Sequence, residues 1–453
     1  MEQSKSVAII GAGPVGLAAA AHVLERGMTP AVLEAGPEIG HAMRQWSHVQ
    51  LFSPWEYNVD KAAERLLAPT GWNSPDPKQY PTGGELLSQY LEPLAHRTVL
   101  KDHIHTSSRV IDISRVGFDK LKTKGRGDAP FELRYQNGQG PKSIRADAVI
   151  DTSGTWFSPN PGGANGLPAL GERENATKIA YGMPDVLGKD RARYAGKAIA
   201  VLGAGHSAVG TLIELTNLKS QAASTEVIWV LRGGNPAKAF GGGVNDKLVA
   251  RGELGMALAG LVTSGQIRVE ASFPVTRIDR DGERLKLATA GCCDRSIVAD
   301  ELIVATGFRS DLEFLRELRI QLDPAIECPI ALAPLIDPNE HSCGTVRPHG
   351  AAELAQDEPG FYFAGMKSYG RAPTFLMLTG YEQVRSIAAK IAGDNEAAAR
   401  VELVLPETGV CSRSATPGQV ECCGGPATER ADACCVDDAK AKGAGKAGCG
   451  CAA

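Results

Sequence analysis

One stretch near the start of the chain decides the fold: Val7-Ala8-Ile9-Ile10-Gly11-Ala12-Gly13-Pro14-Val15-Gly16. An apolar run ends here in the spacing G-x-G-x-x-G, and an alanine-rich helical pattern follows as far as Arg26. A second apolar run, Ala31–Leu33, predicts a strand that is closed by Glu34. A strand, a glycine-rich turn, a helix, a strand and an acidic residue in this order are typical of a dinucleotide-binding unit.

Each residue type in this pattern has a physical task. Gly11 allows the tight turn, and Gly13 lets the backbone approach a pyrophosphate at the positive helix N-terminus. Gly16 lets the helix pack closely on the sheet, and the Glu34 carboxylate can accept hydrogen bonds from an adenosine ribose. A turn without a ligand is the alternative, which the correctly spaced acid disfavours. The residues predicted to bind a dinucleotide here are Gly11, Gly13, Pro14, Gly16 and Glu34, and the acidic strand end suits FAD.

The same plan repeats near the middle of the chain. The apolar run Lys197–Leu202 leads into the turn Gly203-Ala204-Gly205-His206-Ser207-Ala208, and the next predicted strand, Val227–Leu231, ends in Arg232. A carboxylate there would repel a 2′-phosphate, whereas a guanidinium pairs with it. An arginine that is only a surface charge is the alternative. We therefore expect NADPH at this turn, in contact with Gly203, Gly205, His206, Ser207 and Arg232.

Other segments are expected close to the cofactors. Glu38–Trp72 shows little periodicity and predicts a long loop over the cofactor. In this loop Arg44 either contacts a phosphate or carbonyl group or is an ordinary surface arginine. Val110 is a candidate for a backbone contact with an adenine ring. The predicted strand Glu301–Gly307 ends in small residues, so its backbone can pass close to a dinucleotide at Gly307.

The last part of the predicted fold alternates helix, strand and loop. Asp311–Leu318 reads as a helix, Phe361–Gly365 as a last buried strand, and Met366–Arg371 as a loop. Pro373 and Thr374 then begin a helix that runs to about residue 392. The N-terminus of this helix could face the pyrimidine carbonyl of a flavin and stabilise negative charge in the reduced ring.

Size and composition place the chain among ordinary globular proteins. It has 453 residues, of which 43% are hydrophobic and 22% charged, with a formal net charge of −4. This charge gives no indication of a nucleic-acid or anionic-membrane partner. The apolar stretch Val7–Leu24 carries the glycine pattern and His22, so a buried strand and a packed helix explain it better than a membrane span. We expect a cytoplasmic protein that acts on a small molecule.

The two glycine-rich turns and the linker at Pro159–Gly163 predict an α/β fold with two Rossmann-like domains. The predicted boundaries are residues 1–160 for the first part of the FAD domain, 161–310 for an inserted NAD(P)H domain and 311–405 for the second part of the FAD domain. Residues 406–453 lack aromatic side chains and have few aliphatic ones, so a disordered tail is expected there.

The order of these motifs resembles the flavoproteins with two dinucleotide-binding domains. The motifs that carry the resemblance are the two turns with Glu34, Ser153-Gly154, Ala305-Thr306-Gly307 and Tyr362-Phe363-Ala364-Gly365. The resemblance implies cofactor contacts at Gly154 and Gly365. Trp46 and Tyr80-Pro81-Thr82 are similar to the flavin-containing monooxygenase branch, and 343–350 and 367–374 to bacterial flavoproteins that accompany arsenic-resistance genes.

The sequence also departs from several relatives of this kind. The histidine-bearing monooxygenase fingerprint is replaced by Ala180-Tyr181-Gly182-Met183-Pro184-Asp185, and Met366 stands where reductases often carry an aspartate. No Cys-x4-Cys follows the first turn, and no Cys-x-x-Cys lies in the second module. These absences argue against a dithiol centre of the glutathione-reductase or thioredoxin-reductase type.

Seven of the eleven cysteines lie in the last 43 residues. Adjacent and alternating thiols there can converge on a soft ion such as trivalent arsenic or antimony, Cu(I) or zinc. A passive thiol-rich tail is the alternative. The predicted metal ligands are Cys422, Cys423, Cys434, Cys435, Cys449 and Cys451. Cys343, beside His341, is the only candidate for a reactive thiolate, although isolated cysteines are usually structural.

The sequence thus predicts a FAD oxidoreductase that uses NADPH. The leading hypothesis is a monooxygenase-like enzyme that oxygenates a soft nucleophile, such as an arsenical or a thiol compound. The second is a reductase that passes electrons to a metalloid or a disulfide through the tail thiols. The third, from another class, is a flavoprotein whose tail mainly sequesters metalloid.

Overall fold

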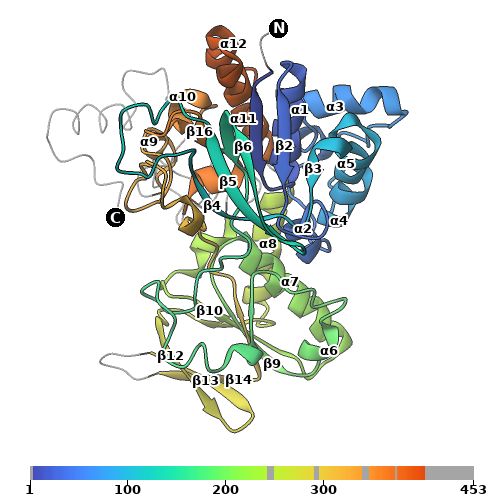
Figure 1. Ribbon diagram of the computed structural model, residues 1–453. Coiled ribbons are helices and arrows are strands. Elements are labelled where there is room, and N and C mark those ends of the chain that lie inside the picture. Colours follow the sequence, from blue (N-terminus) through green and yellow to red (C-terminus); the bar gives the residue numbers. More distant parts are fainter. Residues whose placement is uncertain (1–3, 242–248, 290–294, 339–345, 373–374, 404–453) are drawn as a thin grey trace, which may run out of the picture. The chain divides into compact units, whose positions relative to one another are not determined.

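The computed structural model describes residues 4–403 except 242–248, 290–294, 339–345 and 373–374. Within the described residues the chain divides into two compact units. The first unit takes in Met1–Ser158, Phe308–Asp337 and Arg347–Leu405, and the second takes in Pro159–Gly307. Each unit is built on its own parallel sheet (Figure 1).

The first unit contains a five-stranded sheet in which every neighbouring pair is parallel. The spatial order is β16 (Phe361–Phe363), β7 (Ala148–Asp151), β1 (Ser6–Ile10), β2 (Thr29–Leu33) and β3 (Ile104–His105). Because both faces of such a sheet are covered, its strands are almost continuously apolar. In β1, all four residues from Val7 to Ile10 are buried.

Helices cover one face of this sheet and an antiparallel sheet covers the other. The helix α1 (Pro14–Glu25) lies beside α11 (Met377–Ala392), as Figure 1 shows. The antiparallel sheet has three strands, β4 (Arg109–Arg115), β5 (Phe131–Asn137) and β6 (Gly140–Ala146). Their inward side chains share one hydrophobic cluster with residues of β1, β7 and β16. A turn at residues 138–139 connects β5 and β6.

The region that we expected to be a long loop, Glu38–Trp72, contains regular structure instead. Its elements are α2 (His41–Gln45), a 3-10 turn (Trp55–Tyr57), α3 (Lys61–Leu67) and a second 3-10 turn (Ala68–Thr70). The expectation failed because α3 is short and is fixed by contacts distant in sequence. The Asp60 carboxylate caps α3 by accepting a hydrogen bond from the Ala63 N–H, and it also contacts His22 on α1 at 3.0 Å.

The segment from Gly83 to Arg97 is helical, with an irregular centre. It consists of α4 (Gly83–Leu86), a π-helical segment (Leu87–Leu91) and α5 (Glu92–Arg97), and a 3-10 segment (Val99–His103) follows. Thr82 and Glu85 form a capping box at its start, since each side chain accepts a hydrogen bond from the backbone N–H of the other residue.

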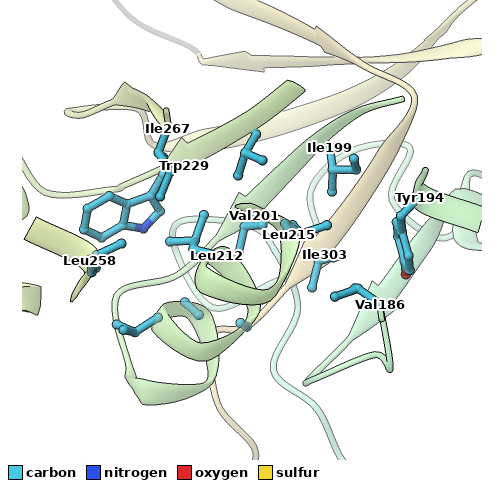
Figure 2. Packing of buried hydrophobic residues seen from close by; sticks show 14 of the residues in the cluster. Val186, Tyr194, Ile199, Val201, Leu212, Leu215, Trp229, Leu258, Ile267 and Ile303 are labelled. Carbon is cyan, nitrogen blue, oxygen red and sulfur yellow. The ribbon is translucent and has the colours of Figure 1, made fainter. Parts of the chain in front are cut away.

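The second unit repeats the parallel arrangement. Its sheet has the order β11 (Arg268–Glu270), β10 (Glu226–Val230), β9 (Ala198–Leu202), β15 (Glu301–Val304) and β8 (Ile179–Tyr181). The helices α7 (His206–Gln221) and α8 (Val249–Thr263) cover one face, and a short helix, α6 (Arg191–Tyr194), precedes β9. Figure 2 shows the core on this face, where Leu212 and Leu215 of α7 pack with Val201, Trp229 and Ile303 of the sheet.

The other face of this sheet packs against a small antiparallel sheet of β12 (Val275–Asp281), β13 (Arg284–Thr289) and β14 (Ser296–Ala299). In β12 the inward residues Val275 and Ile278 are buried while charged residues lie between and after them. A short strand with so few apolar positions gives little periodic signal.

The chain returns to the first unit after Gly307, and two expectations there were wrong. Asp311–Leu318 forms no α-helix but a single 3-10 turn, Glu313–Leu315. This turn already buries Leu315 and Leu318 in the core against β4, which is what the helical spacing had suggested. The expected loop after β16 is a 3-10 turn, Gly365–Tyr369.

The expected helix after this turn is α11, which begins at Met377. The residue before it, Leu376, has an extended backbone, and the Phe375 ring packs edge-on against Tyr369 with 5.1 Å between ring centroids. This packing explains why the helix starts later than the proline suggested. The remaining helices of the unit are α9 (Ala333–Ile336), α10 (Ala351–Leu354) and α12 (Asn395–Ala399).

No helix in the described part of the chain combines the length and the apolar character that crossing a bilayer requires. The predicted tail, 406–453, lies outside the described residues.

Candidate dinucleotide-binding sites

The turn between β1 and α1 has the close contacts expected of its glycines. Gly11 has a positive φ of +98°, which favours glycine, and its N–H donates to the Leu33 carbonyl at 2.8 Å. A Cβ at Gly16 would lie 1.9 Å from the Gly11 carbonyl oxygen, so no side chain fits there. Gly16 therefore allows α1 to start directly against the turn.

Gly13 differs from these two glycines, because a Cβ at its position would meet no atom within 4 Å. Gly13 is the N-cap of α1, no side chain caps this end of the helix, and Pro14 occupies the first helical position. A helix N-terminus with open space and without a capping side chain has the properties that a pyrophosphate requires. The residues present at this turn therefore fit FAD.

Glu34 lies at the end of β2 and is buried, with an exposed fraction of 8%. One carboxylate oxygen accepts a hydrogen bond from the Ala12 N–H at 2.8 Å, and the other accepts one from the Gly36 N–H at 2.8 Å. The carboxylate is thus fixed against the glycine-rich turn. Each oxygen retains a second lone-pair direction that a ribose hydroxyl can use.

The other residues predicted for the first site are spread around this turn. Gly154 has a φ of +68°, and a Cβ there would meet no atom within 4 Å. Val110 on β4 is buried, and its side chain packs in the core with Ile10. Gly365 packs closely on α1, because a Cβ there would lie 3.4 Å from Val15. The Gly365 N–H is already used, since it donates to Gln383 Oε1 at 2.8 Å.

Arg44 and Trp46 occupy α2 and the residue after it. The Arg44 guanidinium forms ion pairs with Glu38 at 2.9 Å and Glu92 at 2.7 Å. It is therefore held by carboxylates, which leaves its predicted cofactor contact a hypothesis. The Trp46 ring lies 6.4 Å from the Trp156 ring, centroid to centroid, and Trp156 in turn stacks on Phe308 at 4.9 Å.

The turn in the second unit, between β9 and α7, has the same construction. Gly203 has a φ of +141°, and a Cβ there would lie 2.3 Å from the Ala305 carbonyl oxygen. Gly205 is the N-cap of α7, no side chain caps the helix, and a Cβ at Gly205 would meet nothing within 4 Å. His206 and Ser207 begin α7. This open helix start also fits a pyrophosphate.

Arg232 follows β10 and is exposed. Its guanidinium donates a hydrogen bond to the Ala164 carbonyl at 3.0 Å. Because a guanidinium has five N–H donors, it can also donate to an anion. Gly307, with a φ of +89°, closes the segment after β15, and a Cβ there would lie 3.4 Å from the Asn160 side chain.

The sequence did not reveal a buried ion pair next to the first turn. Lys367 Nζ lies 2.6 Å from Asp151 Oδ2, and both side chains have an exposed fraction of 0%. Lys367 also donates to Ser153 Oγ at 3.1 Å. Lys367 and Asp151 thus form a buried ion pair, without a hydrogen bond between Lys367 Nζ and Asp151 Oδ2. The sequence signal was an acid and a base at the ends of two strands, but nothing indicated that these strands were neighbours.

The described residues contain one cysteine, Cys328, which is free and buried. Burial, with a smaller contribution from the Asp323 charge, raises the pKa of its thiol to about 12. A thiol with this pKa is protonated at neutral pH and is a poor nucleophile. The predicted reactive residue Cys343 and the cofactor candidate Thr374 lie outside the described residues.

The predicted metal ligands also lie outside the described residues: Cys422, Cys423, Cys434, Cys435, Cys449 and Cys451. Within the part that the structure describes, no three His, Cys, Asp or Glu side chains are grouped to hold a metal ion.

A separate hollow of about 560 Å³ lies in the first unit at the C-terminal end of α1. Its lining includes His22, Arg26, Asp60, Tyr381 and Arg385. These residues are at the opposite end of α1 from Gly13, so this hollow is not the predicted dinucleotide site.

Comparison with known proteins agrees with this architecture. The family model for pyridine nucleotide-disulphide oxidoreductases matches residues 8–330. No curated protein sequence matches the chain.

Among solved structures, the bacillithiol disulfide reductase Bdr of Bacillus cereus is 20% identical, with a TM-score of 0.63 over 86% of this chain and 99% of that one. The FAD-bound cadaverine monooxygenase DfoA of Erwinia amylovora is 14% identical, with a TM-score of 0.62 over 91% and 100% of the two chains. A flavin-containing monooxygenase from Stenotrophomonas maltophilia is 20% identical, with a TM-score of 0.54 over 86% and 99%. These likenesses confirm the predicted fold with two Rossmann-like domains. Because its model matches more than two thirds of the sequence, the chain belongs to the pyridine nucleotide-disulphide oxidoreductase family.

Proposed function

We propose that this oxidoreductase binds FAD at the Gly11 turn and NADPH at the Gly203 turn. The observation that carries the proposal is the pair of open helix starts, at Gly13 and Gly205, which combine with opposite charges at the adjacent strand ends. Glu34 ends the strand in the first unit, and Arg232 follows the strand in the second. The structure of one relative, the cadaverine monooxygenase DfoA, contains FAD, which supports the first assignment.

In this proposal the residues of the chain bind and orient, and the cofactors supply the redox chemistry. The N-termini of α1 and α7 each hold a pyrophosphate, since their backbone N–H groups and helix dipoles favour negative charge. The Glu34 carboxylate accepts hydrogen bonds from the FAD ribose. The Arg232 guanidinium pairs with the 2′-phosphate of NADPH and thereby disfavours NADH.

For the oxidative half of the reaction we propose a monooxygenase-like enzyme. Relatives named as monooxygenases and relatives named as disulfide reductases share the fold, so the fold does not choose between them. The similarity of Trp46 and Tyr80-Pro81-Thr82 to the flavin-containing monooxygenase branch supports the monooxygenase. Among the described residues the one cysteine, Cys328, is buried and protonated and is therefore not a redox thiol. A disulfide or metalloid reductase would have to use cysteines outside them, and this is the second candidate.

For the substrate we propose a soft nucleophile, such as an arsenical or a thiol compound. The support comes from the sequence, in which seven cysteines lie within the last 43 residues and several segments are similar to flavoproteins that accompany arsenic-resistance genes. Thiolates are soft ligands, and they bind soft ions such as trivalent arsenic well.

The experiment uses the purified full-length chain. The proposal predicts stoichiometric FAD, NADPH oxidation in preference to NADH, and oxygen uptake that matches the amount of oxygenated product when an arsenite or thiol substrate is added. Rapid NADPH oxidation without oxygen, in the presence of a disulfide or arsenate, would favour the reductase. A chain that takes up no FAD would contradict the proposed function entirely.

A further inference from the structure

Two buried ion pairs lie at opposite ends of the strand β16. Glu358, just before the strand, pairs with Arg115 at 2.8 Å and with Arg126 at 2.7 Å, and all three side chains are at most 2% exposed. Lys367, just after the strand, pairs with Asp151 at 2.6 Å. A buried charge is costly unless it is paired, so each pair must form when this unit folds. Only the second pair lies at the edge of the sheet that carries the Gly11 turn.

The position of Asp151 follows from the sheet. Asp151 ends β7, where its Cα pairs in register with Ile10 of β1 on one side and Phe363 of β16 on the other. The carboxyl ends of parallel strands meet at one edge, and ligands of such sheets bind there. The Lys367–Asp151 pair therefore lies beneath the edge at which the glycine-rich turn begins.

Ser153 connects this buried pair to the surface. Its N–H and its hydroxyl both donate to Asp151 Oδ1, at 3.0 and 2.7 Å, and its Oγ accepts from Lys367 Nζ at 3.1 Å. Asp151 and Lys367 are fully buried, whereas Ser153 is exposed. The Lys367 ammonium also lies 4.5 Å from the centroid of the Phe314 ring, which restricts its position further.

The backbone around Ser153 touches the glycine-rich turn. A Cβ at Gly11 would lie 3.1 Å from the Ser153 Cα and 3.1 Å from the Thr152 carbonyl oxygen. Thr152 Oγ1 donates to the Ile10 carbonyl at 2.8 Å, and a Cβ at Gly16 would lie 2.7 Å from the same Oγ1. The segment 152–153 is thus one wall of the turn, and a shift of this wall would move the turn.

We propose that Lys367 is a positioning residue for FAD: through Asp151 and Ser153 it holds this wall against the Gly11 turn and so keeps the pyrophosphate site in its binding geometry. The inference rests on the proposed function, since it assigns FAD to this turn. Lys367 acts through Ser153 and needs no contact with the cofactor. Its ammonium is already engaged by Asp151, Ser153 and the Phe314 ring.

The test is a fluorescence titration of the deflavinated full-length chain with FAD. Lys367→Met should raise the FAD dissociation constant at least tenfold and change the visible circular dichroism of the bound flavin. Arg115→Met is the control, because it removes a cation that is nearly as buried as Lys367 at the other end of β16, while Arg126 still pairs with Glu358. It should lower the melting temperature of the apoprotein as Lys367→Met does, yet leave the FAD dissociation constant within twofold of wild type.

Ser153→Ala keeps the test valid if Lys367→Met does not fold. It removes the hydroxyl that hydrogen-bonds to Asp151 and Lys367 but leaves the ion pair in place, and it should still raise the dissociation constant about threefold or more. The inference is overturned if Lys367→Met and Arg115→Met weaken FAD equally, or if Ser153→Ala binds FAD like wild type. A wild-type chain that binds no FAD would overturn the proposed function, and this inference with it.

Discussion

The two glycine-rich turns share one plan but differ at three matched places. The third position is Gly16 in the first turn and Ala208 in the second. In the first turn a Cβ at this position would collide with the Gly11 carbonyl oxygen at 1.9 Å, whereas the second accommodates a real Cβ on a fully buried residue. The Gly11 turn is therefore the tighter of the two.

The second difference lies at the strand ends. Glu34 is buried and both of its oxygens accept backbone hydrogen bonds, whereas Arg232 is exposed and donates to the Ala164 carbonyl. The charge beside the first turn is therefore buried and hydrogen-bonded within the protein, whereas the charge beside the second turn is exposed. The comparison teaches that two turns of the same backbone design can carry opposite charges at the adjacent strand ends, which is the basis of the proposed difference in cofactor.

The third difference lies nine residues after the middle glycine of each turn. His22 of α1 contacts the Asp60 carboxylate at 3.0 Å, so its imidazole has an acidic partner. Glu214 of α7 occupies the corresponding place. Burial, and then the like charge of Asp185, raise the pKa of the Glu214 carboxyl to about 7.

The largest expected effect tests the difference in tightness. Gly16→Ala should abolish FAD binding and lower the free energy of unfolding by about 3 kcal/mol, because the new methyl group overlaps the Gly11 carbonyl. The reciprocal change, Ala208→Gly, should cost only about 1 kcal/mol, the usual penalty of a helical glycine. Denaturant unfolding and FAD titration measure both. Equal losses in the two variants would show that the turns are equally tight.

The next effect concerns the buried carboxylate. Glu34→Ala removes two charge-assisted hydrogen bonds to the backbone as well as the predicted ribose contact. We expect FAD affinity to fall about 10- to 100-fold, in line with hydrogen bonds to charged groups. NADPH binding by the same variant serves as the control and should not change. An unaltered FAD dissociation constant would exclude Glu34 from the site.

The exposed cation should affect the other cofactor only. Arg232→Ala should raise the KM for NADPH about 10-fold or more, because the 2′-phosphate loses its charged partner. The KM for NADH should stay within about threefold, since NADH lacks this phosphate. Steady-state kinetics with both nucleotides provide the measurement. A parallel rise in both KM values would mean that the arginine acts on the fold of the second unit.

A further expected effect is a pH dependence that comes from Glu214 in the second unit. An unfolded Glu214 titrates near 4.5 and the folded one near 7, so between these values the folded state holds the proton more tightly. The free energy of unfolding therefore falls as the pH rises from about 4.5 to 7, on the order of 2 kcal/mol. Glu214→Gln should remove this decline. Denaturant unfolding at pH 5 and pH 7.5 measures it, and an equal slope in the variant would refute the assignment.

The sequence predicted the parts of the fold whose information is local. The glycine spacings, the long apolar strands and the residues at their ends located both turns, located β1 and β9 within one residue, and placed the end of β15 three residues too late. Strands such as β12 were missed because one apolar face of a short strand gives little signal. Asp311–Leu318 was read as a helix because its leucines have helical spacing, but a 3-10 turn buries the same leucines.

For the site, the sequence located the residues of each turn but not their surroundings. Glu34 could be found because its distance from the turn is fixed by one helix and one strand. The pairing of Lys367 with Asp151 could not be found, since it depends on β16 lying next to β7, more than 200 residues away in the chain. Buried polar contacts between distant segments become visible only when the strand order is known.

The most direct test of the cofactor assignment adds one methyl group to each glycine-rich turn. The backbone at Gly13 and at Gly205 is extended, with φ near −81° in both, and a Cβ at either position meets no atom of the described residues within 4 Å. Gly13→Ala should therefore leave the fold and NADPH binding intact but weaken FAD at least tenfold, and Gly205→Ala should do the reverse. Titration of both variants with both cofactors provides the measurement. If each alanine weakened both cofactors equally, or neither, the assignment of one cofactor to each turn would be wrong.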